Sequence, residues 1–305
     1  MLAFIFPGQG SQKLSMIQDF YKESIVQHTF EEASDALNFN VMQLITEDEA
    51  ALNQTAFTQP AILAASIALY RLWELSSQHR PQYLAGHSLG EYTALVAAEV
   101  LSFQDAVKLV QLRGQLMQKA VAPGQGAMAA ILGLDDQGVI NACAEAAHGE
   151  VVSAVNFNSP GQVVIAGEAQ AVTRAIETAK ALGAKRAVPL PVSVPSHCLL
   201  MKSAALELAR HFETVTFHPP IIPIIQNIDG EIHDSVSSIK DALVQQLYNP
   251  VQWVKCVQKL AQLGVTRFVE CGPGKVLTGL NKRILSEGQF LSLEDHPSFE
   301  EACAS

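Results

Sequence analysis

The sequence predicts an α/β fold in which a large unit is interrupted by a smaller one. Short apolar runs that end at glycine or proline, such as Leu2–Phe6 before Pro7 and Gly8, are typical of buried parallel strands. Longer segments with helical periodicity alternate with these runs. With 305 residues, 49% of them hydrophobic and only 16% charged, the chain is long and apolar enough to bury a large core.

The first part of the chain is expected to alternate strands and helices. Pro60 suits the first turn of an Ala/Leu-rich helix, because the N–H that proline lacks is unpaired in that turn anyway. Gly86 ends a short strand, and the small residues Ala94, Ala97 and Ala98 allow close packing of the next helix. After the strand Leu2–Phe6, helices are expected at 16–38, 61–76, 89–99 and 105–120, and a strand at 82–85.

Residues 126–190 have a different organisation and are bounded by Pro123-Gly124 and by Pro189 and Pro191. Strands are expected at 127–132, 151–156, 162–166 and 185–190, and helices at 135–147 and 169–182. This β-α-β-β-α-β order is that of a ferredoxin-like unit. We therefore expect a ferredoxin-like subdomain at 126–190, inserted into a large domain made of residues 1–125 and 191–305.

The α/β pattern resumes after residue 191. Helices are expected at 199–212, 236–248, 251–263 and 275–285, and strands at 221–226 and 265–270. The last of these helices follows a turn at Gly272-Pro273-Gly274. The final stretch of roughly 15–20 residues is polar with little periodicity, so we expect it to fray.

Charge and cysteine content exclude several functional classes. The chain carries 20 Lys and Arg against 30 Asp and Glu, a net charge of −10, whereas binding nucleic acid requires a basic face. Its 5 cysteines are widely spaced without a C-x-x-C pair, which predicts free thiols in a reducing compartment and no metal site. The N-terminal apolar run is too short for a signal peptide, and no apolar stretch reaches the roughly 18 residues of a membrane span. We expect a cytoplasmic protein without metal or cofactor.

The strongest local signal for chemistry is the segment Gly86-His87-Ser88-Leu89-Gly90, a G-x-S-x-G pattern between a predicted strand and a predicted helix. In a nucleophile elbow the two glycines allow a sharp turn that presents the serine at the end of its strand. The N-terminus of the following helix supplies free N–H groups suited to a developing oxyanion. A chance pattern in a loop is the alternative, and the flanking elements favour Ser88 as a nucleophile.

A serine nucleophile needs a general base, and the sequence offers 9 histidines. His197 stands out because it follows Val194-Pro195-Ser196 at a junction between a loop and a helix, where site residues gather. Taken alone, a histidine at a helix start is more often a cap or a surface residue. No acidic residue between Ser88 and His197 has an obvious loop position. We therefore expect a Ser–His dyad held by a backbone carbonyl or an amide side chain rather than a full triad.

Seven short motifs occur in one order along roughly residues 1–285. They are Phe6-Pro7-Gly8-Gln9-Gly10-Ser11-Gln12, Gly86-His87-Ser88-Leu89-Gly90-Glu91, Gln111-Leu112-Arg113-Gly114, Asn156-Phe157-Asn158-Ser159-Pro160-Gly161-Gln162, Val194-Pro195-Ser196-His197, Tyr248-Asn249-Pro250-Val251-Gln252-Trp253 and Gly272-Pro273-Gly274-Lys275. Each motif alone is weak, but the ordered set resembles the malonyl-CoA:acyl carrier protein transacylases of bacterial type II fatty acid synthesis.

The resemblance implies catalytic roles for five positions. Ser88 is the nucleophile that carries the malonyl ester, and His197 is its base. The backbone carbonyl of Gln252 orients the imidazole, which accounts for the missing acid. Backbone N–H groups of Gln9 and Leu89 form the oxyanion hole. The resemblance also implies an α/β-hydrolase-like large domain with a ferredoxin-like insert.

The resemblance further implies which residues hold the acyl group. Arg113 binds the malonyl carboxylate, and Met117, one helical turn beyond it, lines the acyl pocket. A planar guanidinium pairs with a carboxylate through two hydrogen bonds, which lysine cannot match. Without an acidic substrate, Arg113 would be a surface residue or a partner of Glu91 or Asp105.

The implied partners are malonyl-CoA and acyl carrier protein, the latter bound transiently, and the expected state is a monomer. Acyl carrier protein is acidic in this family, so docking on a chain of net charge −10 requires a local basic patch. A solvated charged surface is the alternative for the same side chains. The candidates are Lys180, Lys185, Arg186, Lys275, Lys282 and Arg283.

Three other functions stay open on the residues alone. A serine hydrolase such as a thioesterase can use the same elbow, although Arg113 and the absence of a loop acid argue against it. A catalytically silent binding subunit is disfavoured by the presence of both Ser88 and His197. An acyltransferase of a polyketide or polyunsaturated fatty acid pathway is compatible, because the small Ser196 leaves room for a methyl-bearing acyl group. The strictness for malonyl, the pathway, the docking surface and the oligomeric state are left open.

Overall fold

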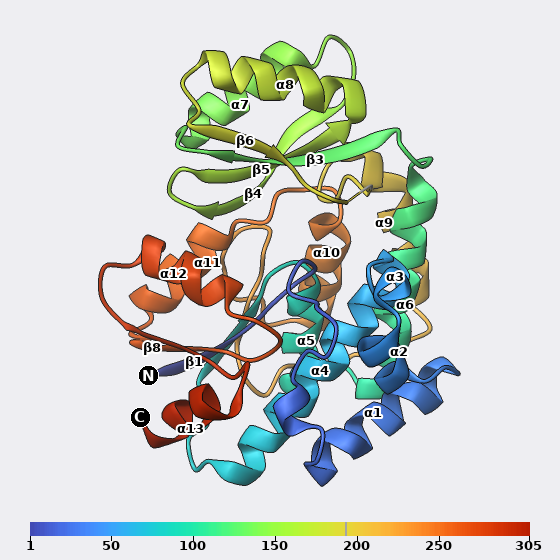
Figure 1. The fold of residues 1–305 in the computed structure, drawn as a ribbon, viewed down its shortest axis with the longest axis vertical. Helices are drawn as coiled ribbons and strands as arrows, with labels where there is room; N and C mark the ends of the chain where they lie inside the picture. Colours follow the sequence, from blue (N-terminus) through green and yellow to red (C-terminus); the bar gives the residue numbers. More distant parts are fainter. Residues whose placement is uncertain (193) are drawn as a thin grey trace.

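The fold is built on two β-sheets, as Figure 1 shows for the computed structural model, which describes residues 1–192 and 194–305. Within this described part of the chain, the larger sheet has five parallel strands in the order β7-β2-β1-β8-β9. The α/β class predicted from the sequence is confirmed. The strands of this sheet are β1 (Leu2–Phe6), β2 (Tyr83–Gly86), β7 (Ile224–Ile225), β8 (Arg267–Glu270) and β9 (Gln289–Ser292).

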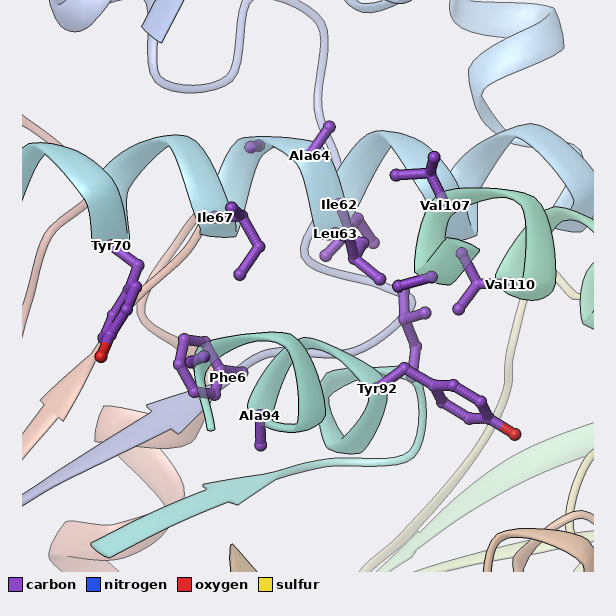
Figure 2. Close-up of a cluster of buried hydrophobic side chains, with 14 of the residues drawn as sticks. Phe6, Ile62, Leu63, Ala64, Ile67, Tyr70, Tyr92, Ala94, Val107 and Val110 are labelled. Carbon is purple, nitrogen blue, oxygen red and sulfur yellow. The ribbon is translucent and has the colours of Figure 1, made fainter. Parts of the chain in front are cut away.

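Helices cover both faces of the larger sheet. Successive side chains of a strand point to opposite faces, and in β1 the side chains on both faces are apolar. Phe4 and Phe6 of β1 belong to one buried apolar cluster, whereas Ala3 and Ile5 belong to another. Figure 2 shows part of the first cluster, which includes Phe6 of β1 together with Ile67, Tyr92 and Val107 of the helices on this face. The first cluster includes α1 (Ser24–Leu37), α4 (Thr55–Ser76), α5 (Leu89–Ala97) and α6 (Phe103–Ala120), and the second includes α11 (Trp253–Gln262) and α12 (Val276–Ile284).

The smaller sheet and its two helices form the insert, at the top of Figure 1. Its strands are antiparallel in the order β4-β5-β3-β6, and the predicted β-α-β-β-α-β order is confirmed. The two helices pack on one face around their own apolar cluster. On the other face, Met128 and Val155 cluster with Cys198, which follows the insert in the chain. The elements are β3 (Gly126–Leu132), α7 (Asp136–Ala146), β4 (Val152–Ser159), β5 (Gln162–Glu168), α8 (Ala169–Ala181) and β6 (Arg186–Pro189).

The end of the chain is structured, so the expectation that it frays is wrong. Strand β9 pairs with β8, and helix α13 (His296–Ala304) begins after Asp295, whose side chain accepts a hydrogen bond from the N–H of Ser298. Leu293 and Phe299 are buried in the main cluster, and the Phe299 ring lies 5.5 Å from that of Phe20. A few well-spaced apolar residues thus fix a segment whose overall composition is polar.

Other predicted elements differ from the structure mainly at their ends. The helix expected at 16–38 begins only at Ser24, because Ile17 has a φ of 55° and a short 3₁₀ turn follows it. Helix α4 begins at Thr55, so Pro60 lies inside it rather than in its first turn. The strand expected at 221–226 is reduced to β7. The remaining helices are α2 (Val41–Glu47), α3 (Glu49–Leu52), α9 (Lys202–Phe212) and α10 (Val236–Gln246).

A search of the described residues for a helix with the length and hydropathy needed to cross a bilayer finds none.

Candidate active site

The G-x-S-x-G segment forms a sharp turn between β2 and α5. Ser88 lies at this turn with φ 53° and ψ −107°, a strained combination for a residue with a side chain. A Cβ atom on Gly86 would lie 1.9 Å from the backbone of Gly90, and one on Gly90 would lie 2.0 Å from the carbonyl oxygen of Phe6. Both glycines are therefore required sterically, and the predicted nucleophile elbow has the expected geometry.

The Ser88 hydroxyl lies against the imidazole of His197. The distance from Ser88 Oγ to His197 Nε2 is 2.8 Å, and His197 Nδ1 lies 2.7 Å from the carbonyl oxygen of Gln246. A carbonyl only accepts hydrogen bonds, so Nδ1 carries the proton and Nε2 is left to accept from the hydroxyl. This is the arrangement that a general base needs.

Electrostatics keeps this imidazole neutral. Burial is the main cause and the nearby Arg113 guanidinium the second, and together they lower the pKa of His197 to about 3. The hydrogen bond to the Gln246 carbonyl acts in the opposite direction but is weaker. His197 is therefore ready to take a proton over the whole neutral pH range.

The carbonyl that orients the base belongs to Gln246, so the expectation for Gln252 is wrong. Gln252 directly precedes α11, and its carbonyl accepts the N–H of Cys256 at 3.0 Å. Gln246 is the last residue of α10, where carbonyl groups have no partner within the helix. The helix was expected to continue to 248, because Pro250 disfavours helix only at Asn249, and so the end at Gln246 was not predicted.

Arg113 of α6 is buried, with 1% of its surface exposed, and points at Ser88. Its Nη2 donates to Ser88 Oγ at 3.2 Å and to Gln246 Oε1 at 3.0 Å, while Nη1 donates to Gln59 Oε1 at 2.9 Å. Its Cζ lies 5.4 Å from the centre of the Tyr92 ring. Among the described residues, Arg113 forms no ion pair with a carboxylate. A buried guanidinium held only by neutral groups is suited to receive an anion.

A cavity of about 110 Å³ connects these groups and lies where the insert meets the large unit. Met117, which is buried, lines it, as the sequence analysis expected. Met128 and Asn156 of the insert line the same cavity. Its lining also includes Gln9, His87, Ser88, Leu89, Arg113, Leu190, Val192, Val194, Ser196 and His197.

The backbone amides of Gln9 and Leu89 both belong to residues of this cavity. Within residues 1–192 and 194–305, neither N–H donates to another group of the protein. Gly8 allows the first loop to approach the elbow, since a Cβ atom there would lie 2.5 Å from the carbonyl oxygen of His87. Both residues thus line the same cavity as Ser88 with N–H groups that have no partner in the described part of the chain.

Comparison with known proteins identifies this arrangement. The acyl transferase domain family matches residues 3–295. The malonyl CoA-acyl carrier protein transacylase of Haemophilus influenzae is 55% identical over 300 residues, covering 97% of this chain and 96% of that protein. The chain belongs to the malonyl CoA-acyl carrier protein transacylase family. The sequence resemblance is therefore confirmed, and the protein is an acyltransferase.

Solved structures of this transacylase family share the fold over nearly the whole chain. The enzyme of Xanthomonas oryzae is 50% identical with a TM-score of 0.98, and the match covers 99% of this chain and 97% of that one. A malonyl-transacylase in complex with a type II PKS acyl-carrier protein is also 50% identical with a TM-score of 0.98, and the match covers 99% of both chains.

Two buried residues support the elbow of this transacylase, and neither was predicted from the sequence to do so. Asn227 accepts from the N–H of Ser88 at 2.7 Å and donates to the carbonyl of Gly86 at 2.7 Å, so it holds both sides of the turn. Glu91 accepts from the N–H of Asn227 at 3.0 Å. Asn227 could have been found as a polar residue directly after a strand, at the sheet edge where α/β proteins place their sites.

The six basic residues considered for carrier docking lie on two parts of the molecule. Lys180 pairs with Glu177 at 2.9 Å, and Lys275 pairs with Glu294 at 2.8 Å. Arg283 of α12 donates to Gln162 of the insert at 2.9 Å. The others are Lys185, directly before β6, Arg186 at the start of β6, and Lys282 on α12.

Proposed function

We propose that this protein transfers the malonyl group of malonyl-CoA to the phosphopantetheine thiol of acyl carrier protein, through a malonyl ester on Ser88, for fatty acid biosynthesis. One observation carries the proposal: a buried guanidinium that has no carboxylate partner among the described residues lies 3.2 Å from the hydroxyl of a Ser–His dyad. The names of the relatives support the same reaction.

The proposed first half-reaction forms the ester. Ser88 Oγ attacks the thioester carbonyl while its proton moves to His197 Nε2. The N–H groups of Gln9 and Leu89 stabilise the oxyanion of the tetrahedral intermediate. The C–S bond then breaks, and His197 returns the proton to the departing CoA sulfur.

The second half-reaction reverses these steps with a different thiol. The phosphopantetheine thiol gives its proton to His197 and attacks the ester carbonyl, and Ser88 Oγ leaves with the proton. Because a thioester is exchanged for another thioester, no external energy source is required. The small cavity supports this proposal, since water must be kept away from the waiting ester.

Arg113 is proposed to select malonyl over uncharged acyl groups. A charge-assisted hydrogen bond contributes about 1.5–3 kcal/mol, and an unpaired buried charge costs more. Once Ser88 is acylated, its oxygen is a weak acceptor, so the malonyl carboxylate can take its place at Nη2. This difference corresponds to roughly 10²-fold discrimination against acetyl. Met117 is proposed to limit the length of the acyl group.

The finer description of the fold belongs to the same proposal. Residues 1–125 and 191–305 are proposed to form an α/β-hydrolase-like domain, and residues 126–190 a ferredoxin-like inserted subdomain. The separate sheet and apolar cluster of the insert support this division. We also propose that the protein acts as a cytoplasmic monomer that meets its carrier transiently. The complex of a relative with its carrier protein supports the partner.

The experiment that tests this function is an acyl-CoA panel assayed with holo acyl carrier protein. Malonyl-CoA should label the wild-type protein on Ser88, as seen by peptide mass spectrometry, and the label should pass to the carrier thiol. The Ser88→Ala variant is the control and should take no label. Release of free malonate faster than transfer would identify a thioesterase instead, and an unlabelled wild-type protein would support a silent binding subunit.

A further inference from the structure

A buried carboxylate lies directly behind the nucleophile and has no part in the proposed reaction. Glu91, in the first turn of α5, has no exposed surface. Its Oε2 accepts from the N–H of Asn227 and from Gln246 Nε2, both at 3.0 Å. Its Oε1 has no partner among the described residues. Burying a carboxylate with one oxygen left without a hydrogen bond costs free energy, so a functional reason for Glu91 is expected at this position.

The side-chain amide of Gln246 connects Glu91 to the groups of the site. Its Nε2 donates to Glu91 and to the carbonyl oxygen of Ser88 at 2.9 Å, while its Oε1 accepts from Arg113 Nη2 at 3.0 Å. Turning the amide over would bring its NH₂ group against the guanidinium and its oxygen against two other oxygens. The orientation of the amide is therefore fixed by the groups on both sides.

The group that this arrangement holds in place is the Arg113 guanidinium. Arg113 has no direct ion pair in the described part of the chain. Tyr92 and then Glu91 favour its charged form electrostatically, and Glu91 is the carboxylate of the two, acting across the amide. Hydrogen bonds to an ionised acceptor are roughly twice as strong as those to a neutral one. An ionised Glu91 thus holds the amide firmly, and the amide oxygen then faces the guanidinium.

We propose that Glu91 is a positioning residue for malonyl recognition: in its ionised form it fixes the Gln246 amide, which holds the Arg113 guanidinium beside Ser88. The inference rests on the proposed function, because it concerns how Arg113 is held in place for a carboxylate substrate. It differs from a purely structural role by predicting that malonyl and acetyl transfer respond unequally.

The charge state of Glu91 makes this inference accessible to a pH experiment. Burial is the main cause that raises the pKa of Glu91 to about 7, against the opposing hydrogen bonds from Gln246 and Asn227. The titratable and charged groups that act on or are acted on by it are His233, Arg113, Tyr92 and Cys256. Since a carboxyl is charged above its pKa, Glu91 supports Arg113 above about pH 7 and loses this effect below it.

The test is the ratio of kcat/KM for malonyl-CoA to that for acetyl-CoA, measured with holo acyl carrier protein from about pH 6 to about pH 8.5. Using a ratio cancels the titration of the carrier thiol and of His197, and the malonyl carboxyl itself is ionised throughout because its pKa lies near that of other carboxyls. In the wild type, the ratio should fall roughly 5–10-fold towards pH 6. In Glu91→Gln, it should be roughly 10-fold lower at pH 8.5 and independent of pH, with the change mainly in KM for malonyl-CoA.

Glu270→Gln is the matched control. Glu270 is also a buried glutamate whose pKa is raised to about 7, chiefly by burial, but it accepts from the N–H groups of Leu277 and Thr278 at the start of α12. This variant should keep the wild-type ratio and its pH dependence.

The outcomes separate this inference from the proposed function. A wild-type ratio that is flat with pH, or an unchanged ratio in Glu91→Gln, would overturn the role of Glu91 while malonyl transfer itself is still observed. Should Glu91→Gln fail to fold, the wild-type pH profile decides alone. Absence of a malonyl label on wild-type Ser88 would instead overturn the proposed function.

Discussion

The two sides of the site are built in different ways. The nucleophile side is one continuous segment, in which β2, the elbow at Ser88 and α5 follow each other within residues 83–97. The base side joins His197 to Gln246, which are 49 positions apart in the chain and come together outside regular secondary structure or at a helix end. The nucleophile side is therefore defined by local sequence, whereas the base side depends on the packing of distant segments. The difference predicts how each side responds to substitution.

The largest effect is expected on the nucleophile side. Ser88→Ala removes the oxygen that is proposed to carry the malonyl ester, so transfer to acyl carrier protein should fall at least ~10⁴-fold. The elbow is held by Gly86, Gly90 and Asn227 and not by the hydroxyl, so thermal unfolding should change by only a few degrees. Residual malonyl transfer within about tenfold of wild type would show that another group is the nucleophile.

The second effect concerns the cation that lies between the two sides. Arg113→Ala should lower kcat/KM for malonyl-CoA roughly 10²–10³-fold, because the substrate carboxylate would be buried without a partner. Transfer of acetyl or another uncharged acyl group should persist or rise. Steady-state rates with both donors measure this, and an equal fall for both would remove the specificity role from Arg113.

A third prediction separates the two glutamines of the base side. Gln246→Ala keeps the carbonyl that orients His197 but loses the amide that holds Arg113, so malonyl transfer should fall roughly 10–100-fold. Gln252→Ala should change it by less than about threefold, because its backbone hydrogen bonds to Asn227 and Cys256 are kept and Gln252 is not among the described residues that line the cavity. A larger loss in Gln252→Ala than in Gln246→Ala would restore the original expectation for Gln252.

The same comparison explains what could be predicted from the sequence. The elbow was found because strand, glycine, serine, glycine and helix are consecutive, and each can be identified by local chemistry. His197 was predicted as the base because it is a histidine at a junction between a loop and a helix. Its partner was assigned to the wrong glutamine, because a backbone carbonyl is present at every residue and only the true end of α10 singles out Gln246.

The fold shows the same limit. The strands and helices of the insert were predicted in the right order, since each has a regular period bounded by glycine or proline. The last helix was missed, because Phe299 and Ala302 are fixed by contacts with residues far away in sequence, such as Phe20 and Trp73. Glu91 and Asn227 were missed as supporting residues for a related reason: their burial is a property of the folded chain.

The smallest expected effect is on stability, and it has opposite signs on the two sides. Glu91 has its pKa raised from 4.5 to about 7, so the unfolded chain loses this proton first and the protein is destabilised as the pH rises from about 4.5 to about 7. His197 has its pKa lowered from 6.5 to about 3, so the unfolded chain gains this proton first and the protein is destabilised as the pH falls below about 6.5. As the pH falls from 7 to 5, the free energy of unfolding of Glu91→Gln should therefore decrease relative to that of the wild type by about 2 kcal/mol. Over the same pH range, that of His197→Gln should increase relative to the wild type by about 2 kcal/mol. Chemical denaturation of the three proteins at both pH values measures these slopes, in which the constant cost of lost contacts cancels. Slopes of the same sign would contradict the opposite pKa shifts of Glu91 and His197, and a slope near zero would mean that the group concerned is solvated in the folded protein.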